Sequence, residues 1–493
     1  MAWPYLSRGT QPLLRRNCRY HMVVFLLTFT SYVLYHASRK AFSSVKVSIS
    51  SFWILHSTRV YPNSTYFSLN TQQAILLWGT LDTISLFSCA VGLFMNGIVG
   101  GWIGLRWLMA IGMCCKGIMT FSFGTLSKWP CFYNKWFYFS LWMFNGLLES
   151  TGWPLVVAIM DIWFGITGQG FLLGLWGACA SMGNVLGACV SVLLLQYGYE
   201  YTFLVTAFMQ LTAGLIIIFT ICISPEQPAV IYIERESDSE DELERMIMMY
   251  GEIDTDGLEE NEYYDFVEVV EGQNDLLLRP IVFHEVSPFP EVLLHSLTNA
   301  CVKLVNYSFF FWLPFYLNSS FGFAEAKVSQ FSVWYDLEEI VNGTFQGFLS
   351  DVVQKRSMFA LCVLLTIGSL VGYNHTPKNK AINALLMSIT GLFIGGPSNV
   401  TGSVISTGLG CPEQMQGSRK ALATGTGIAN TTVSIDTAVG QYLVSLIQDK
   451  LRWMWVFWFF VLVTACTLLL ISVLLLREIR NFVQRRLAPT FRE

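Results

Sequence analysis

Apolar runs of about 18 to 28 residues recur along nearly the whole chain, and they constrain its fold more than any other feature. Each run is long enough to cross a bilayer as a helix. Because a bilayer core offers no water to backbone polar groups, helices are the structures that such runs form there. We therefore expect an all-α membrane protein with twelve transmembrane helices. The expected spans are 21–43, 74–98, 105–126, 136–160, 170–195, 201–223, 292–317, 328–350, 359–373, 381–406, 421–447 and 453–476.

The spacing of the runs predicts two halves. Six spans precede a long hydrophilic break and six follow it, so we expect an N-terminal half (1–223), a cytosolic linker (224–290), a C-terminal half (291–476) and a basic cytosolic tail (477–493). The linker is acidic and resembles a disordered segment. The alternative for the linker is a phosphorylation or partner site at Ser237 and Ser239.

Charge is distributed unevenly between the linker and the rest of the chain. Residues 224–290 hold 19 Asp and Glu against 3 Arg, which leaves 15 acidic and 27 basic residues elsewhere, a net charge near +12. Only 13% of the chain is charged and 53% is hydrophobic, whereas soluble domains carry about 25% charge. The membrane-embedded part is therefore expected to favour anions.

Lys and Arg predict the orientation of the chain. With the N-terminus in the cytosol, 14 basic residues fall on the cytosolic side and 9, including Lys46, on the opposite side. A glycosylation acceptor, Asn63, then falls in the first lumenal loop. We expect both termini in the cytosol.

Basic residues inside the spans indicate an anion site. Arg39 lies in the first span and Lys303 in the seventh, at equivalent places in the two halves. Charges within spans are costly and usually functional, and two cations that face one cavity repel each other unless an anion bridges them. The alternative is that Arg39 and Lys40, near the expected lumenal end of their span, extend to the membrane interface. Lys116 stands alone in the third span.

Motifs of other functional classes are absent from the sequence. No Cys or His cluster has metal-ligand spacing, no Gly-rich loop with Lys-Ser/Thr suggests nucleotide binding, and no nucleophile motif suggests catalysis. We expect no enzyme activity, no metal, no cofactor and no nucleic-acid partner.

An internal repeat carries a first resemblance. Gly97 and Arg106 stand nine positions apart after the second span, and Gly347 and Arg356 do so after the eighth. Together with Asp351, this loop resembles the signature of the major facilitator superfamily, whose fold has two six-helix halves. The resemblance implies gating roles for Asp351, Arg356 and Arg106. The first copy departs from the signature, with Gly101 in place of Asp.

Further motifs resemble the organophosphate:phosphate antiporters over nearly the whole chain, and most closely the sugar-phosphate exchangers (solute carrier family 37, member 3-like branch). The motifs are Arg39-Lys40-Ala-Phe42, Gly152-Trp-Pro154, Gly183-Asn184, Lys303 and 438–450. The resemblance implies that Arg39 and Lys303 bind the phosphoryl group and that the membrane is endoplasmic reticulum or endolysosomal. The candidate substrate-binding residues are Arg39, Lys40, Lys303, Tyr35, His36 and Asn184.

Several positions depart from that pattern. Besides Gly101 they are Asp161, Ile166, Glu338, Glu339, Gly408 and Asp436. Three interpretations of the two glutamates remain open: a pair with Lys303 that weakens phosphate binding, a proton-coupling group, or two side chains in a wet cavity.

The function expected from these observations is antiport of an organophosphate, such as a sugar phosphate, for inorganic phosphate by alternating access. The partners expected are these two anions and the lipid bilayer. Two alternatives remain: a transport-impaired relative that acts as a scaffold for an accessory membrane protein, and a proton-coupled carrier of another anion.

Overall fold

The computed structural model describes most of the predicted spans. The described residues are 11–60, 71–103, 105–128, 134–156, 159, 169–220, 290–324, 327–338, 340, 356–375, 379–406 and 419–487. Asn63, Asp161, Ile166, Glu339, Asp351 and Gly408 lie outside them.

The described residues form helices and contain no strand. The helices are α1 (Gln11–Val60), α2 (Thr71–Ile103), α3 (Leu105–Lys128), α4 (Lys135–Glu149), α6 (Gln169–Leu194), α7 (Tyr199–Thr220), α12 (Pro290–Phe321), α14 (Arg356–Asn374), α15 (Lys380–Ser406), α16 (Arg419–Leu451) and α17 (Trp453–Leu487).

Every predicted span contains described helical residues, and in the eighth span these are residues 328–338 and 340. The prediction of an all-α chain is confirmed. Within the described ranges, five segments are long and apolar enough to cross a membrane by length and composition alone. They are Gln73–Leu93, Leu105–Leu126, Tyr199–Thr220, Ser296–Phe321 and Trp453–Ser472.

The first helix is longer than the sequence predicted. α1 has 50 residues, which makes it about 75 Å long at 1.5 Å per residue. The predicted lumenal end at Ser43 is wrong, because the helix continues to Val60 and buries Lys46 and Trp53. Ser43, Lys46 and Ser50 lower the hydropathy of this stretch, but these side chains bond to neighbouring helices and are buried.

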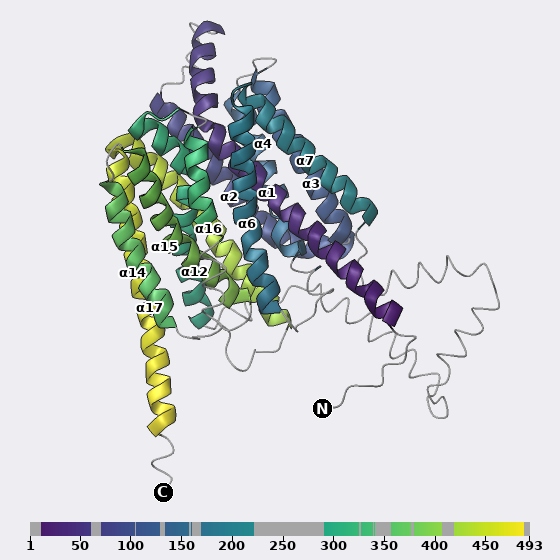
Figure 1. Cartoon of the computed structure of the whole chain (residues 1–493), viewed down its shortest axis with the longest axis vertical. Helices are drawn as coiled ribbons and strands as arrows, with labels where there is room; N and C mark the ends of the chain where they lie inside the picture. Colours follow the sequence, from purple (N-terminus) through teal and green to yellow (C-terminus); the bar gives the residue numbers. More distant parts are fainter. Residues whose placement is uncertain are drawn as a thin grey trace, which may run out of the picture.

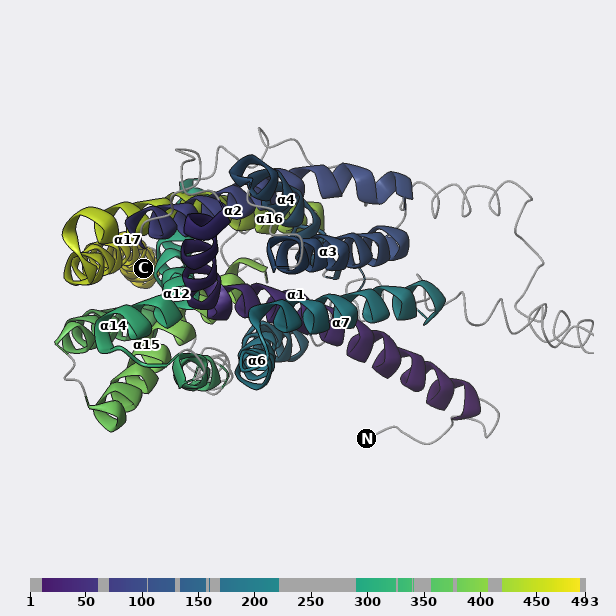
Figure 2. The same cartoon turned by 90° about the horizontal axis from the view of Figure 1, so that it is seen from above.

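The two sequence halves lie side by side (Figures 1 and 2), with α3 and α7 on one flank and α14 and α17 on the other. Between them, α2 packs along α16 and α1 packs on α12. The hydroxyl of Thr83 donates to the carbonyl of Ala438 at 3.0 Å, and that of Ser43 donates to the carbonyl of Phe310 at 2.8 Å. This packing brings the middle of α1 against the C-terminal half.

Close approach of α6 to α1 depends on two glycines. A Cβ on Gly183 would meet the carbonyl oxygen of Val33, and a Cβ on Gly187 would meet the backbone of Ala37. Small residues allow helix backbones to approach in this way. The contact fixes the position of α1 next to Arg39 and Lys40.

Candidate functional site

The basic residues of α1 are buried inside the protein. The side chain of Arg39 is 10% exposed and that of Lys40 is 0% exposed. The alternative in which both extend to the membrane interface is therefore wrong. That alternative depended on a lumenal end at Ser43, and the true helix places Arg39 and Lys40 near its middle.

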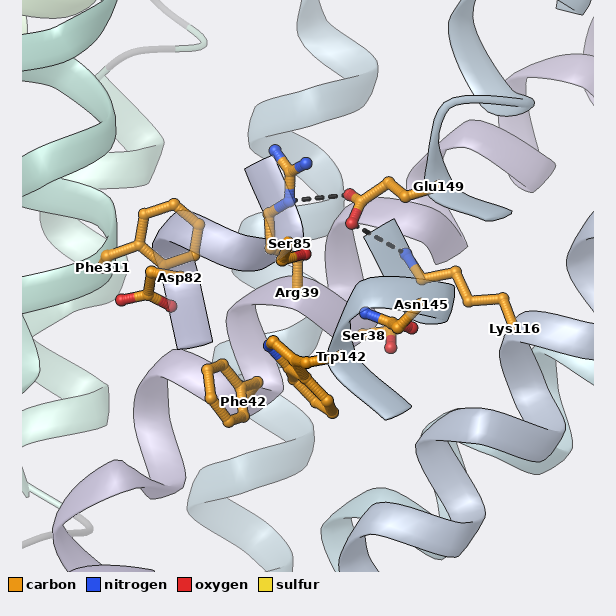
Figure 3. Close-up of a pocket in the computed structure, with 10 residues that line it drawn as sticks. All are labelled: Ser38, Arg39, Phe42, Asp82, Ser85, Lys116, Trp142, Asn145, Glu149 and Phe311. Carbon is orange, nitrogen blue, oxygen red and sulfur yellow. Dashed lines mark ion pairs between the residues drawn. The ribbon is translucent and has the colours of Figure 1, made fainter. Parts of the chain in front are cut away.

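Arg39 belongs to a three-residue ion-pair network. Its Nε lies 2.7 Å from Oε1 of Glu149, at the end of α4, and Nζ of Lys116 on α3 lies 3.4 Å from Oε2 of the same carboxylate. Figure 3 shows this bridge, in which Nε of Arg39 is the guanidinium nitrogen that pairs with Glu149. Lys116, which seemed isolated in the sequence, thus has a buried partner. One carboxylate neutralises part of the charge of two cations.

A small cavity of about 20 Å³ adjoins the network in the N-terminal half, and Phe311 on α12 of the C-terminal half completes its lining. Two rings on α12 lie over the guanidinium of Arg39. The guanidinium carbon is 5.5 Å from the ring centre of Tyr307 and 6.0 Å from that of Phe311, within cation–π range. The guanidinium therefore lies between both halves. The cavity is lined by Ser38, Arg39, Phe42, Asp82, Ser85, Lys116, Trp142, Asn145, Glu149 and Phe311.

Lys40 points to the C-terminal half instead of the cavity. Its Nζ lies 2.7 Å from Oδ2 of Asp336, in the helical residues 327–338, and 4.9 Å from the ring centre of Phe310. Both charged side chains are at most 1% exposed. A direct contact between Lys40 and substrate would require this pair to separate.

Lys46 forms a third pair, six residues beyond Lys40 on α1. Its Nζ donates to Oδ2 of Asp82 on α2 at 2.5 Å and lies 5.0 Å from the ring centre of Trp312. The expectation that Lys46 lies at the lumenal surface is wrong, because its side chain is 0% exposed. A buried lysine is tolerated here because a carboxylate matches its charge.

The remaining predicted binding residues surround Arg39. The hydroxyls of Tyr35 and Thr151 are 2.9 Å apart. His36 packs its ring edge-to-face on Tyr32. Lys303 lies on α12, which packs on α1, and it is partly buried.

Asn184 lies on α6 beside α1. It is buried, and its Oδ1 has no hydrogen-bond partner among the described residues. An unsatisfied buried acceptor is uncommon and is often found where a ligand or water binds.

The predicted gating residues are only partly described. Arg106 stacks on Trp107 with its guanidinium carbon 5.2 Å from the ring centre, and Arg356 begins α14. Among the departures, Gly101 lies in α2, and Glu338 and Asp436 are partly buried.

Three acidic partners were missed in the sequence: Glu149, Asp82 and Asp336. Each lies inside a predicted span, where a carboxylate is costly without a partner. That signal alone would have marked them as candidates for pairing with the basic residues of the first span. No group of His, Cys, Asp and Glu suited to a metal ion occurs in the described part of the chain. The site is thus suited to an anion, through a guanidinium and nearby amines.

The chain is similar to known proteins over most of its length. Residues 28–423 match the family model of the Major Facilitator Superfamily. The chain is 53% identical to "Sugar phosphate exchanger 3" of Bos taurus over 99% of both chains, and 30% identical to "Glucose-6-phosphate exchanger SLC37A2" of Xenopus tropicalis over 96% of both. Among solved structures, a crystal structure of a D-xylose-proton symporter superposes with a TM-score of 0.64 at 12% identity, covering 92% of this chain and 97% of that one.

Proposed function

This chain belongs to the sugar phosphate exchanger family of the major facilitator superfamily, and from that premise we propose that it exchanges a phosphorylated sugar for inorganic phosphate across a membrane by alternating access. The family is one of transporters, not enzymes. The two relatives described above are named for exchange of sugar phosphates, which supports the substrate class proposed here.

The position of Arg39 is the observation that carries the proposal. Its side chain lines a small cavity of the N-terminal half that Phe311 completes, and the rings of Tyr307 and Phe311 from the C-terminal half lie over its guanidinium. A planar guanidinium binds two phosphate oxygens at once, and an amine adds a point charge. In this proposal Arg39 binds the phosphoryl group from the N-terminal half and Lys303 from the C-terminal half.

The other candidate residues have supporting roles in this proposal. Asn184 and Tyr35 supply hydrogen bonds to the substrate, and His36, which is buried one turn before Lys40 on α1, tunes the charge of the site. Lys40 is bound to Asp336 across the halves, so it contributes when the halves move. Asp351, Arg356 and Arg106 gate the cytosolic side.

Counterflow in liposomes tests the proposed function. Purified protein is reconstituted with phosphate inside, and uptake of labelled phosphate is measured with and without external sugar phosphate. We expect exchange that sugar phosphates inhibit. Arg39→Ala should abolish it, whereas Lys135→Ala, which removes an exposed cation at the start of α4, should not.

Absence of exchange by folded, inserted wild-type protein would contradict the proposal. It would favour the scaffold for an accessory membrane protein. Uptake that requires a pH gradient and is lost in Glu338→Gln would favour the proton-coupled carrier instead.

The proposed orientation places both termini in the cytosol, in an endoplasmic reticulum or endolysosomal membrane. The first residues of α1 and the last residues of α17 lie toward the same end of the molecule (Figure 1), which suits this topology. Glycosylation at Asn63 tests it: Asn63→Gln should remove a glycan-dependent shift in electrophoretic mobility. A wild-type protein without any glycan at this position would argue against the orientation.

A further inference from the structure

Glu149 occupies a contact with Arg39 for which an anionic substrate would compete. One oxygen of the Glu149 carboxylate lies 2.7 Å from Arg39 Nε, and the other lies 3.4 Å from Lys116 Nζ. A phosphoryl group bound between the same cations would place two of its oxygens in a similar way. The side chain of Glu149 is therefore a counterion of the site that the protein itself supplies.

The bridge is sheltered from water. Glu149 is 8% exposed, Lys116 is 1% exposed and Arg39 is 10% exposed. Charges in such a setting interact much more strongly than in bulk water. Two cations left without an anion would repel each other and lose their hydration, which would oppose closure of the cavity.

The two halves nevertheless close around this bridge. The rings of Tyr307 and Phe311 lie over Arg39 from α12, and Lys40 is joined to Asp336 across the halves. The charge of Arg39 is matched by Glu149 entirely within the N-terminal half. Closure around Arg39 is thus compatible with a carboxylate from the protein in contact with it.

We propose that Glu149 is an internal substitute for the substrate anion, and that it allows the substrate-free carrier to change between its two orientations. Exchange is then not obligatory, and phosphate also moves without a counter-substrate. This inference rests on the proposed function, since it assumes that Arg39 binds phosphate. A neutral residue at position 149 would leave Arg39 and Lys116 unmatched in the substrate-free carrier, and only a carrier with bound anion would reorient.

A comparison of two fluxes tests the inference. Liposomes are loaded with labelled inorganic phosphate, and efflux is measured into medium with phosphate (exchange) and without it (net efflux). Potassium and valinomycin in both media prevent charge build-up. We expect wild-type net efflux within about tenfold of exchange. Glu149→Gln should lower net efflux at least about tenfold relative to its own exchange.

Two matched variants accompany this experiment. Glu149→Asp keeps a carboxylate and should keep net efflux. Glu200→Gln removes a different buried carboxylate, which lies 3.7 Å from Lys128, and should leave the ratio of the two fluxes as in wild type. These controls separate loss of the counterion from a general effect of losing a buried charge.

The outcomes distinguish this inference from the proposed function. Wild-type exchange without net efflux would overturn the inference and leave the proposed function intact, and this result does not depend on any variant folding. A Glu149→Gln protein with the wild-type ratio of fluxes would also overturn it. Equal loss of both fluxes in folded Glu149→Gln would mean that Glu149 only positions Arg39, against the inference. Absence of both fluxes in the wild type would instead contradict the proposed function.

Discussion

The pair between Lys40 and Asp336 joins the two halves, and its removal should destabilise the protein in a defined way. Both side chains are at most 1% exposed, and their charged atoms are 2.7 Å apart. Removing one partner of a buried pair costs about 3–5 kcal/mol, because the other charge is left unmatched. In Asp336→Asn, Lys40 keeps its contact with the ring of Phe310 at 4.9 Å, which is worth up to about 2 kcal/mol when desolvated. We therefore expect a loss near the lower limit, about 3 kcal/mol.

The double variant makes this expectation specific. In Lys40→Met with Asp336→Asn no charge remains unmatched, so the loss should be smaller than the sum of the two single losses by at least about 2 kcal/mol. Equilibrium unfolding in mixed detergent micelles measures the free energy of unfolding of all four proteins. Single variants within about 0.5 kcal/mol of wild type would refute the reasoning, as would strictly additive losses.

Three further predictions concern other parts of the site. Lys46→Met should leave the carboxylate of Asp82 buried and unmatched and lower the free energy of unfolding by about 3 kcal/mol; a melting point equal to wild type would contradict this. Gly187→Val should force α6 away from the backbone of Ala37 and lower the melting temperature, whereas Gly372→Val, which meets no atom within 4 Å, should not; equal effects of the two would argue against helix contact as the cause. Arg39→Lys keeps the charge but loses the planar fork, so the affinity for phosphate in counterflow should fall about tenfold, and an unchanged affinity would remove the bidentate contact from the proposal.

Hydropathy was sufficient to locate the helices because each span must satisfy its own backbone in lipid. It failed at the end of α1. There the polar side chains Ser43, Lys46 and Ser50 make contacts inside the bundle, and a hydropathy average treats them as if they faced water. The same limit led the sequence to place Lys46 at the surface.

The sequence also identified Arg39 and Lys303 as candidates, because a cation inside a span is conspicuous by itself. It did not identify what each cation binds. Partners such as Glu149 and Asp336 lie about 110 and 296 positions from Arg39 and Lys40 along the chain, and only the packing of helices brings them together.

By itself, therefore, the sequence determined that this chain is an all-helical membrane protein with basic residues inside its spans, since length, hydropathy and charge are local properties. The tertiary structure decided how those charges are matched: Arg39 and Lys116 with Glu149, and Lys40 with Asp336. The physical reason is that a buried charge is governed by its nearest neighbours in space. Those neighbours come from other helices, and their identity depends on which helix faces which.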